Sequence, residues 1–311
     1  MKNNIIEKKR WMNVVKQNDL VQKVRYKLDL VQQKTIMYLC SQIDSTKDVE
    51  FQDITVDIRE LCEIMGIQYN GKNLKDFKDA IQKLSDKSMW VDTGKQIQLM
   101  RWLQRVNIDK GSTKVTVRFD ELMAPYLLQI KGRFTQYNLI NVLPMKSQYS
   151  LRLYELIKSY CGLGEWKIYL DELRKLLYIE SSSYLEFYEF KRKVLDKAVE
   201  EINCFTDIQI AFDTTRTNRK ISGIRFVMVD HLSVEDMSRR RINQDVALGN
   251  IPTGQVSKPN KLTVQDIRGM QQLQKKAREM KELSEKYKKP DPVDYSEEVS
   301  FMPGQQSLFD I

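Results

Sequence analysis

The chain has 311 residues, of which 41% are hydrophobic, and it carries 51 Lys and Arg against 42 Asp and Glu. This length accommodates two domains of ordinary size with a tail, and this hydrophobic content excludes wholesale disorder. The positive net charge indicates a polyanionic partner. With one histidine, His231, and four widely separated cysteines, the sequence has no residue set for a zinc site. We therefore expect no metal, no cofactor and no catalytic site, so the protein is not expected to be an enzyme.

No run of about 18 apolar residues could span a membrane. The basic segment at residues 1–11 lacks the apolar stretch of a secretory signal. The cysteines form no C-x-x-C pair, which fits free thiols in a reducing compartment. We therefore expect a cytoplasmic protein that does not associate with membranes.

In chain order, an N-terminal arm (residues 1–18) precedes the first of two similar segments, residues 19–143. This segment is expected to contain three helices and several strands, at residues 29–43, 54–56, 58–65, 73–87, 89–92, 97–108 and 114–119. Asp57 is the expected N-cap of the second helix, and Gly66 is its expected stop.

The same order returns in residues 144–232, with elements expected at residues 147–160, 166–169, 171–178, 184–203, 206–212 and 221–229. Asp171 is the expected cap that corresponds to Asp57, at an offset of 114 residues (171 − 57 = 114). Helix, short strand, two helices and a two-stranded hairpin are the elements of a winged helix-turn-helix. The sequence therefore predicts an α+β fold of tandem winged helix-turn-helix domains, followed by a flexible C-terminal tail.

A winged helix places one helix in the major groove of DNA and reaches the backbone with its hairpin, the wing. In the second domain, Phe190 and Val194 are expected to face the core and leave a basic helix face outside. The loop TTRTNRK, residues 214–220, contains no acidic residue and is expected to be the wing. The predicted DNA-binding residues of this domain are Lys191, Arg192, Lys193, Lys197, Arg216, Asn218, Arg219 and Lys220.

In the first domain, Lys72, Lys75 and Lys78 are the predicted DNA-binding residues of the corresponding helix. Asp76 and Asp79 dilute this positive charge. We therefore expect the first domain to contribute less than the second to base reading. Its hairpin is then available for contact with another protein instead of DNA.

Two segments, SQYSLRLYEL (147–156) and FKRKVLDKAVEEIN (190–203), resemble the initiator Rep proteins of theta-replicating bacterial plasmids. The resemblance covers about residues 15–230. It implies binding to double-stranded origin DNA at repeated sequences (iterons) and recruitment of host replication proteins. It also implies a monomer–dimer equilibrium in which dimers repress the initiator's own promoter, a form of plasmid copy number control. The second domain's helix and wing would carry the DNA contacts.

Residues 233–311 are expected to form a linker, a charged helix near residues 263–288 and a disordered tail. In the tail, Gln305, Leu308 and Phe309 resemble the short motif that binds the bacterial sliding clamp. Gln306 departs from that motif, in which Leu is commoner. A tether that presents two large apolar side chains suits a preformed groove.

The favoured function is a plasmid replication initiator that binds origin repeats and recruits host replication proteins. The alternative is a winged-helix transcriptional repressor without initiator activity, because the same fold serves both. A rolling-circle initiator that nicks DNA needs paired histidines on a metal, and one histidine cannot supply them.

Overall fold

The computed structural model describes residues 2–180, 182–230, 232–253 and 261–286. The predictions made for His231, Gln305, Leu308 and Phe309 lie outside these residues. Within them, the chain up to Gln271 forms one compact unit. None of the described helices is long and apolar enough to cross a membrane.

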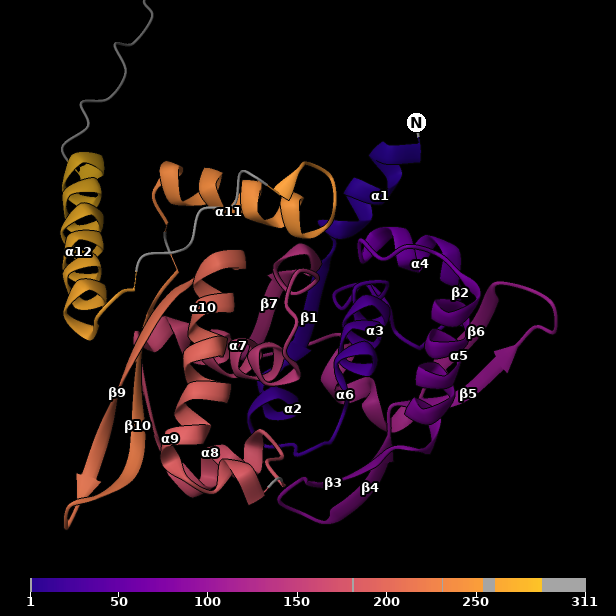
Figure 1. The fold of residues 1–311 in the computed structure, drawn as a ribbon, viewed down its shortest axis with the longest axis horizontal. Helices are drawn as coiled ribbons and strands as arrows, with labels where there is room; N and C mark the ends of the chain where they lie inside the picture. Colours follow the sequence, from indigo (N-terminus) through magenta and orange to yellow (C-terminus); the bar gives the residue numbers. More distant parts are fainter. Residues whose placement is uncertain (1, 181, 231, 254–260, 287–311) are drawn as a thin grey trace, which may run out of the picture. The chain divides into compact units, whose positions relative to one another are not determined.

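The first winged helix has the predicted order of elements and occupies the right side of the unit in Figure 1. Its elements are α3 (Leu30–Cys40), β2 (Ile54–Asp57), α4 (Ile58–Ile64), α5 (Gly71–Asp86), β5 (Leu103–Ile108) and β6 (Lys114–Phe119). Asp57 caps α4 by accepting a hydrogen bond from the Arg59 amide. Gly66 follows α4 with a φ of 66°, a conformation that favours glycine. Both predicted helix boundaries are therefore confirmed.

The second winged helix repeats this order on the left side of the unit (Figure 1). It consists of α7 (Gln148–Tyr160), β8 (Glu165–Tyr169), α8 (Leu170–Leu176), α9 (Phe187–Phe190), η5 (Lys191–Leu195), α10 (Asp196–Phe205), β9 (Gln209–Thr217) and β10 (Lys220–Val229). The two sheets have equivalent strand orders, β2-β6-β5 and β8-β10-β9. This shared topology confirms the α+β fold of tandem winged helices.

Asp171 is not the N-cap that the sequence predicts. Helix α8 begins one residue earlier, at Leu170, and its N-cap is Tyr169, whose side chain makes no capping hydrogen bond. Asp171 lies in the first turn instead, where a carboxylate interacts favourably with the helix dipole.

The predicted N-terminal arm is wrong as a description of residues 2–17. These residues form α1 (Lys2–Arg10) and β1 (Asn13–Gln17), and β1 pairs antiparallel with β7 (Phe134–Asn138). Hydrophobic periodicity does not predict this strand, because Val14 and Lys16 occupy its buried positions and Lys16 is charged. Short helices complete the unit: α2 (Asn18–Gln22), η1 (Glu121–Met123), α6 (Ala124–Leu127), η2 (Leu139–Asn141), η3 (Cys161–Leu163) and η4 (Ser182–Tyr184).

The two halves share one hydrophobic core, with a charged cluster buried where they meet. Lys16 Nζ lies 2.6 Å from Glu155 Oε1, and the Tyr137 hydroxyl donates to the same oxygen at 2.7 Å. Lys16 is 2% exposed and Glu155 is fully buried. Burial raises the pKa of Glu155, but Lys16 and Arg152 outweigh it and hold this pKa below its usual value. The ion pair therefore stays charged and joins β1 to α7.

The predicted strand over residues 97–108 is two strands in different sheets. β4 (Ile97–Arg101) forms a separate hairpin with β3 (Ser88–Asp92), whereas β5 belongs to the wing sheet of the first half. The break falls at Trp102, whose side chain is 1% exposed. The second half has no counterpart of this hairpin between its described helix and wing.

The predicted linker is wrong for residues 234–247, which form α11 (Val234–Ala247). Arg240, which the sequence places in the predicted linker, is 5% exposed and donates to the carbonyl oxygens of Thr206 and Ile208. Leu248 then packs against Gly66, where an added Cβ would lie 2.7 Å from the Leu248 carbonyl oxygen. Helix α11 therefore connects the end of α10 to the end of α4.

The predicted charged helix is confirmed as α12 (Val264–Lys286). Its first turn is exposed on one face only, because Val264 and Ile267 pack on Ala211, Val227 and Val229 of the second wing sheet.

Candidate nucleic-acid interface

The helical run from α9 to α10 holds the cations predicted to read DNA. Phe190 and Val194 are fully buried and fix the run against the core, as predicted. Residues Lys191–Leu195 form a π-helical turn rather than the regular helix that the sequence predicts. Such turns are rare and often occur at functional sites. The π-helical turn carries three of the predicted cations.

These three cations are not the free donors that the sequence suggests. Lys191 Nζ lies 2.6 Å from Asp196 Oδ1. Arg192 Nη2 and Lys193 Nζ lie 2.9 Å and 2.8 Å from Glu189 Oε2. Lys193 and then Arg192 hold the pKa of Glu189 below its usual value by hydrogen bonding. Because all these side chains are partly exposed, such pairs are weak and can exchange partners with a phosphate.

The predicted wing is an exposed hairpin tip. Asn218 and Arg219 occupy the two central turn positions with φ values of 49° and 70°, the conformation of a tight two-residue hairpin turn. Arg216, Asn218, Arg219 and Lys220 are all exposed. None of the three basic side chains at this tip forms an ion pair with a carboxylate in the described part of the chain. The wing therefore presents unpaired positive charge.

The wing sheet depends on one close approach at Gly223. A Cβ at this position would lie 2.7 Å from Thr215 Oγ1 and 2.8 Å from the Ile168 carbonyl oxygen. The sheet register shifts between Ile221 and Gly223, next to the turn. A bulge of this kind strengthens local twist and helps to aim the hairpin tip.

A groove of about 940 Å³ runs between the helix and β9. It brings Lys191, Arg192 and Lys197 together, opposite Thr214. It also includes exposed Lys261, which sequence reasoning missed because it precedes α12 at a distance from any DNA-reading element. The groove thus contains three of the four helix cations, without Lys193, and the carboxylates of Asp196, Glu200 and Asp213 also line it.

In the first half, the three predicted lysines do not act alike. Lys72 and Lys75 are exposed on α5. Lys78 is half-buried, and its Nζ donates to the Ser112 carbonyl oxygen at 2.7 Å. Lys78 therefore fastens α5 to the loop between β5 and β6 instead of facing solvent freely.

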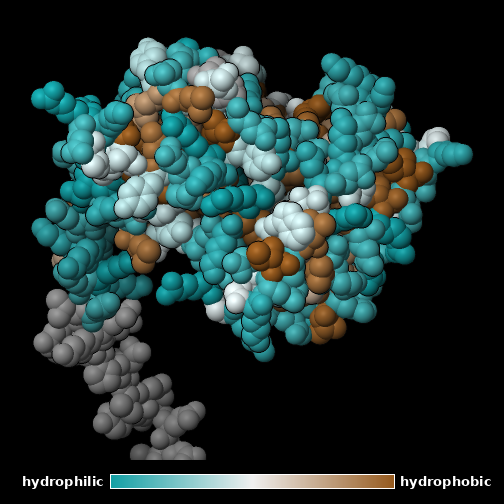
Figure 2. Space-filling model, turned by 90° about the horizontal axis from the view of Figure 1, so that it is seen from below, coloured by the Kyte–Doolittle hydropathy of each residue, from teal (hydrophilic) through white to brown (hydrophobic). Residues whose placement is uncertain are grey.

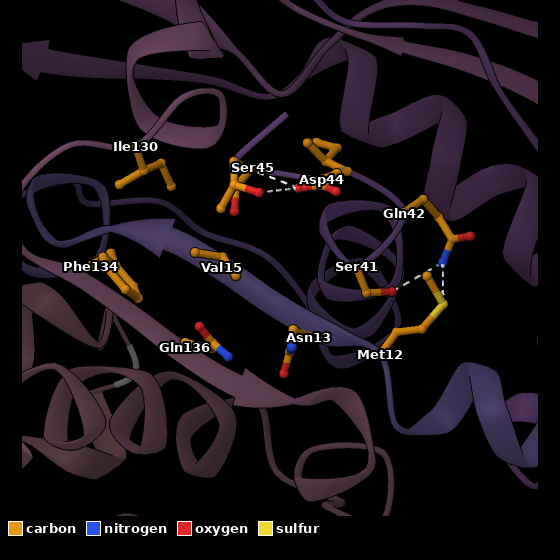
Figure 3. A pocket seen from close by; sticks show the side chains of 12 residues that line it. Met12, Asn13, Val15, Ser41, Gln42, Asp44, Ser45, Ile130, Phe134 and Gln136 are labelled. Carbon is orange, nitrogen blue, oxygen red and sulfur yellow. Dashed lines mark hydrogen bonds between the residues drawn. The ribbon is translucent and has the colours of Figure 1, made fainter. Parts of the chain in front are cut away.

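A separate recess of about 440 Å³ lies on the face of β1 and β7 (Figure 3). Val15, Ile130 and Phe134 supply apolar surface, and Asp44 is the one ionisable residue among the described residues that line it. Hydrogen bonds from Thr46 lower the pKa of Asp44. The recess offers no paired groups for acid–base catalysis. No group of three or more metal-binding side chains was found among the described residues.

Comparison with known proteins matches both halves. Residues 13–158 match the family model described as "Initiator Replication protein, WH1", and residues 169–228 match "Initiator Rep protein, WH2". In the fold, the crystal structure titled "Crystal structure of Pi initiator protein in complex with iteron DNA" is similar with a TM-score of 0.60. That likeness has 22% identity and covers 72% of this chain and 99% of the other.

Three curated relatives are replication proteins. A "Probable replication protein rep" of Bifidobacterium longum (strain NCC 2705) is 28% identical over 64% of this chain and 67% of its own length. A "Replication initiation protein" of Escherichia coli is 28% identical over 38% of each chain. The "PI protein" of Escherichia coli is 32% identical over 43% of this chain and 48% of its own length. The chain thus matches less than half the length of the last two.

Proposed function

The chain belongs to the initiator Rep protein family, and from this membership we propose that it initiates plasmid replication by binding repeated sequences in double-stranded origin DNA. The observation that carries the proposal is the unpaired positive charge of the second wing beside the basic helical run. A protein of similar fold, the Pi initiator, was crystallised with iteron DNA.

The geometry suggests how the second half would hold a duplex. The run from Phe187 to Phe205 presents its cations on the exposed side, and a helix of this kind fits the major groove. Arg216, Arg219 and Lys220 would meet phosphates along the backbone. Lys197, which forms no ion pair among the described residues, is a further donor.

Footprinting on the DNA that flanks the gene tests this function. An initiator protects several regularly spaced repeats, whereas one isolated protected operator would favour the alternative, a transcriptional repressor without initiator activity. A plasmid that carries only the candidate origin provides the second arm. It should persist in cells that express the protein and be lost from cells that do not.

We propose further that the protein recruits host replication proteins, including the sliding clamp. The support is the tail motif at Gln305, Leu308 and Phe309, outside the described residues. Leu308→Ala with Phe309→Ala in the full chain should abolish capture of purified clamp and leave origin binding unchanged. Undiminished capture would remove the clamp from the proposal.

We also propose a monomer–dimer equilibrium, and the hairpin of β3 and β4 supports it. Trp90, Ile97 and Leu99 are 66%, 69% and 46% exposed, and Figure 2 shows hydrophobic surface on the side of the molecule where this hairpin lies. In the hairpin, Asp92 lies at one end of this face and Arg101 at the other. A two-fold axis between them would place each Arg101 near the partner's Asp92, as an isologous interface requires.

Replacing the apolar centre of this face tests the dimer. Trp90→Ser with Leu99→Ser should shift the protein to the monomer in analytical ultracentrifugation and relieve repression of its own promoter. Leu163→Ser, a change at an exposed leucine of the second half, is the matched control. An undisturbed dimer in the double variant would place the interface elsewhere.

A further inference from the structure

We propose that Glu189 is a specificity-determining residue of the DNA-reading helix: it pairs with Arg192 and Lys193 and thereby suppresses binding to arbitrary DNA. This inference rests on the proposed function. Glu189 is an acidic residue in a surface that the sequence predicts to bind DNA through its positive charge.

The contacts of Glu189 use both carboxylate oxygens. Arg192 Nη2 donates to Oε1 at 3.2 Å and to Oε2 at 2.9 Å, and Lys193 Nζ lies 2.8 Å from Oε2. The Glu189 side chain is 28% exposed, whereas those of Arg192 and Lys193 are 56% and 41% exposed. The carboxylate thus lies deeper than its two partners and leaves their outer surfaces accessible.

The wing differs from the helix in this respect. Arg216, Arg219 and Lys220 have no carboxylate partner among the described residues. On the helix, Glu189 holds two cations and Asp196 holds Lys191. The wing therefore supplies positive charge for any duplex, while the helix carries a reduced net charge.

This difference favours specificity because the two kinds of binding depend on different interactions. Binding to arbitrary DNA is almost wholly electrostatic, so each net charge removed from the interface weakens it. Base reading depends on hydrogen bonds at fixed positions, such as the paired contacts of Arg with guanine. A carboxylate that orients Arg192 and offsets its charge therefore weakens binding to arbitrary DNA more than it weakens base reading.

Glu189→Gln tests the inference, because it removes the charge and keeps the shape. Binding of the full chain is measured by salt titration on a duplex with origin repeats and on an unrelated duplex of equal length. We expect the unrelated duplex to bind about tenfold tighter, with a salt slope steeper by about one. Origin binding should change by less than about threefold, so that the specificity ratio falls.

Glu200→Gln is the matched control, since Glu200 is exposed on the same helical run and forms no ion pair among the described residues. It makes the same change in net charge and should alter the ratio less. An equal gain on both duplexes, or an equal effect of Glu200→Gln, would overturn the inference. A selective loss of origin binding would also overturn it, because Glu189 would then contact a base itself.

The two proposals fail separately. If the unaltered protein shows no preference for origin repeats, the proposed function fails. If the unaltered protein prefers them and Glu189→Gln keeps the same ratio, only the role of Glu189 fails. Unchanged thermal unfolding of the variant confirms that its fold is intact.

Discussion

The two winged helices share one topology but use their positive charge differently. In the first half, Lys78 is bound to the loop of its own wing, and Arg105 and Arg118 lie near Asp53. In the second half, the wing cations Arg216, Arg219 and Lys220 have no carboxylate partner in the described chain. The two wings thus differ in how their arginines are paired, which supports the proposal that the second half presents more of its charge to DNA.

The first half has an exposed apolar surface on a hairpin that the described part of the second half lacks. The hairpin of β3 and β4, absent between the described helix and wing of the second half, exposes Trp90 and Ile97. Large exposed apolar side chains mark a site of protein contact. The comparison thus supports the proposal that the second half carries most of the DNA contacts and the first half carries self-association.

The largest expected effect on stability comes from breaking the ion pair between Lys16 and Glu155, which connects β1 to α7. Lys16→Met leaves the fully buried Glu155 carboxylate without its partner, so the free energy of unfolding should fall by about 3–5 kcal/mol. Chemical denaturation should still show one transition, because both halves share a core. Lys16→Met combined with Glu155→Leu should recover part of the loss. A decrease of less than about 1 kcal/mol in the free energy of unfolding of Lys16→Met would contradict a stabilising role for this pair.

A second buried lysine near the same junction makes stability depend on pH. Burial lowers the pKa of Lys34 to about 8, against the opposing attraction of Glu201. Between pH 8 and about 10.4 the folded chain loses this proton while the unfolded chain keeps it, so the contribution of Lys34 to stability should rise with pH, relative to a variant without this lysine. The rise, up to about 3 kcal/mol, should disappear in Lys34→Met. Parallel pH profiles of the two proteins would contradict it.

A smaller effect on stability is expected on α5, where Lys78 should differ from the exposed lysines of the same helix. Lys78→Met removes the hydrogen bond to Ser112 and should lower the free energy of unfolding by about 1–2 kcal/mol, with little change in DNA affinity. Lys75→Met, at an exposed position of the same helix, should leave stability unchanged. Thermal unfolding and DNA binding of both variants check this contrast.

The order of elements in the two winged helices could be predicted from the sequence, whereas several structured segments outside that pattern, β1 and α11 among them, could not. Hydrophobic periodicity identified the helices and wing strands of both halves because their buried positions are apolar. It failed at β1, where Lys16 is buried in an ion pair, and at α11, where Arg240 is buried against backbone carbonyls. In both cases a charged side chain satisfied by a distant partner looks like solvated surface.

The segments that carry the family resemblance largely hold the fold together. Glu201 accepts hydrogen bonds from the amides of Lys146 and Ser147 at the start of α7. Asn203 exchanges two hydrogen bonds with the backbone of Ile210. Glu201 and Asn203 thus act within the fold, whereas Lys191, Arg192, Lys193 and Lys197 of the same segment are the side chains proposed to contact DNA.

Within the candidate site, the exposed wing could be predicted from its composition, but the pairing of the helix cations only in part. Glu189 precedes Arg192 and Lys193 by three and four residues, a helical spacing at which opposite charges meet. Lys191 and Asp196 are five residues apart, which a regular helix separates by about 140°. Their contact depends on the π-helical turn, and nothing in the sequence indicated that turn.

The unequal use of charge by the two halves is tested most directly by the salt dependence of origin binding in two matched double variants. Arg216→Ala with Arg219→Ala should lower the slope of log affinity against log salt by about two. Lys72→Ala with Lys75→Ala, which removes the same charge from the first half, should lower it by less than about one. Equal changes, or a larger change in the first half, would contradict the assignment of DNA binding to the second winged helix.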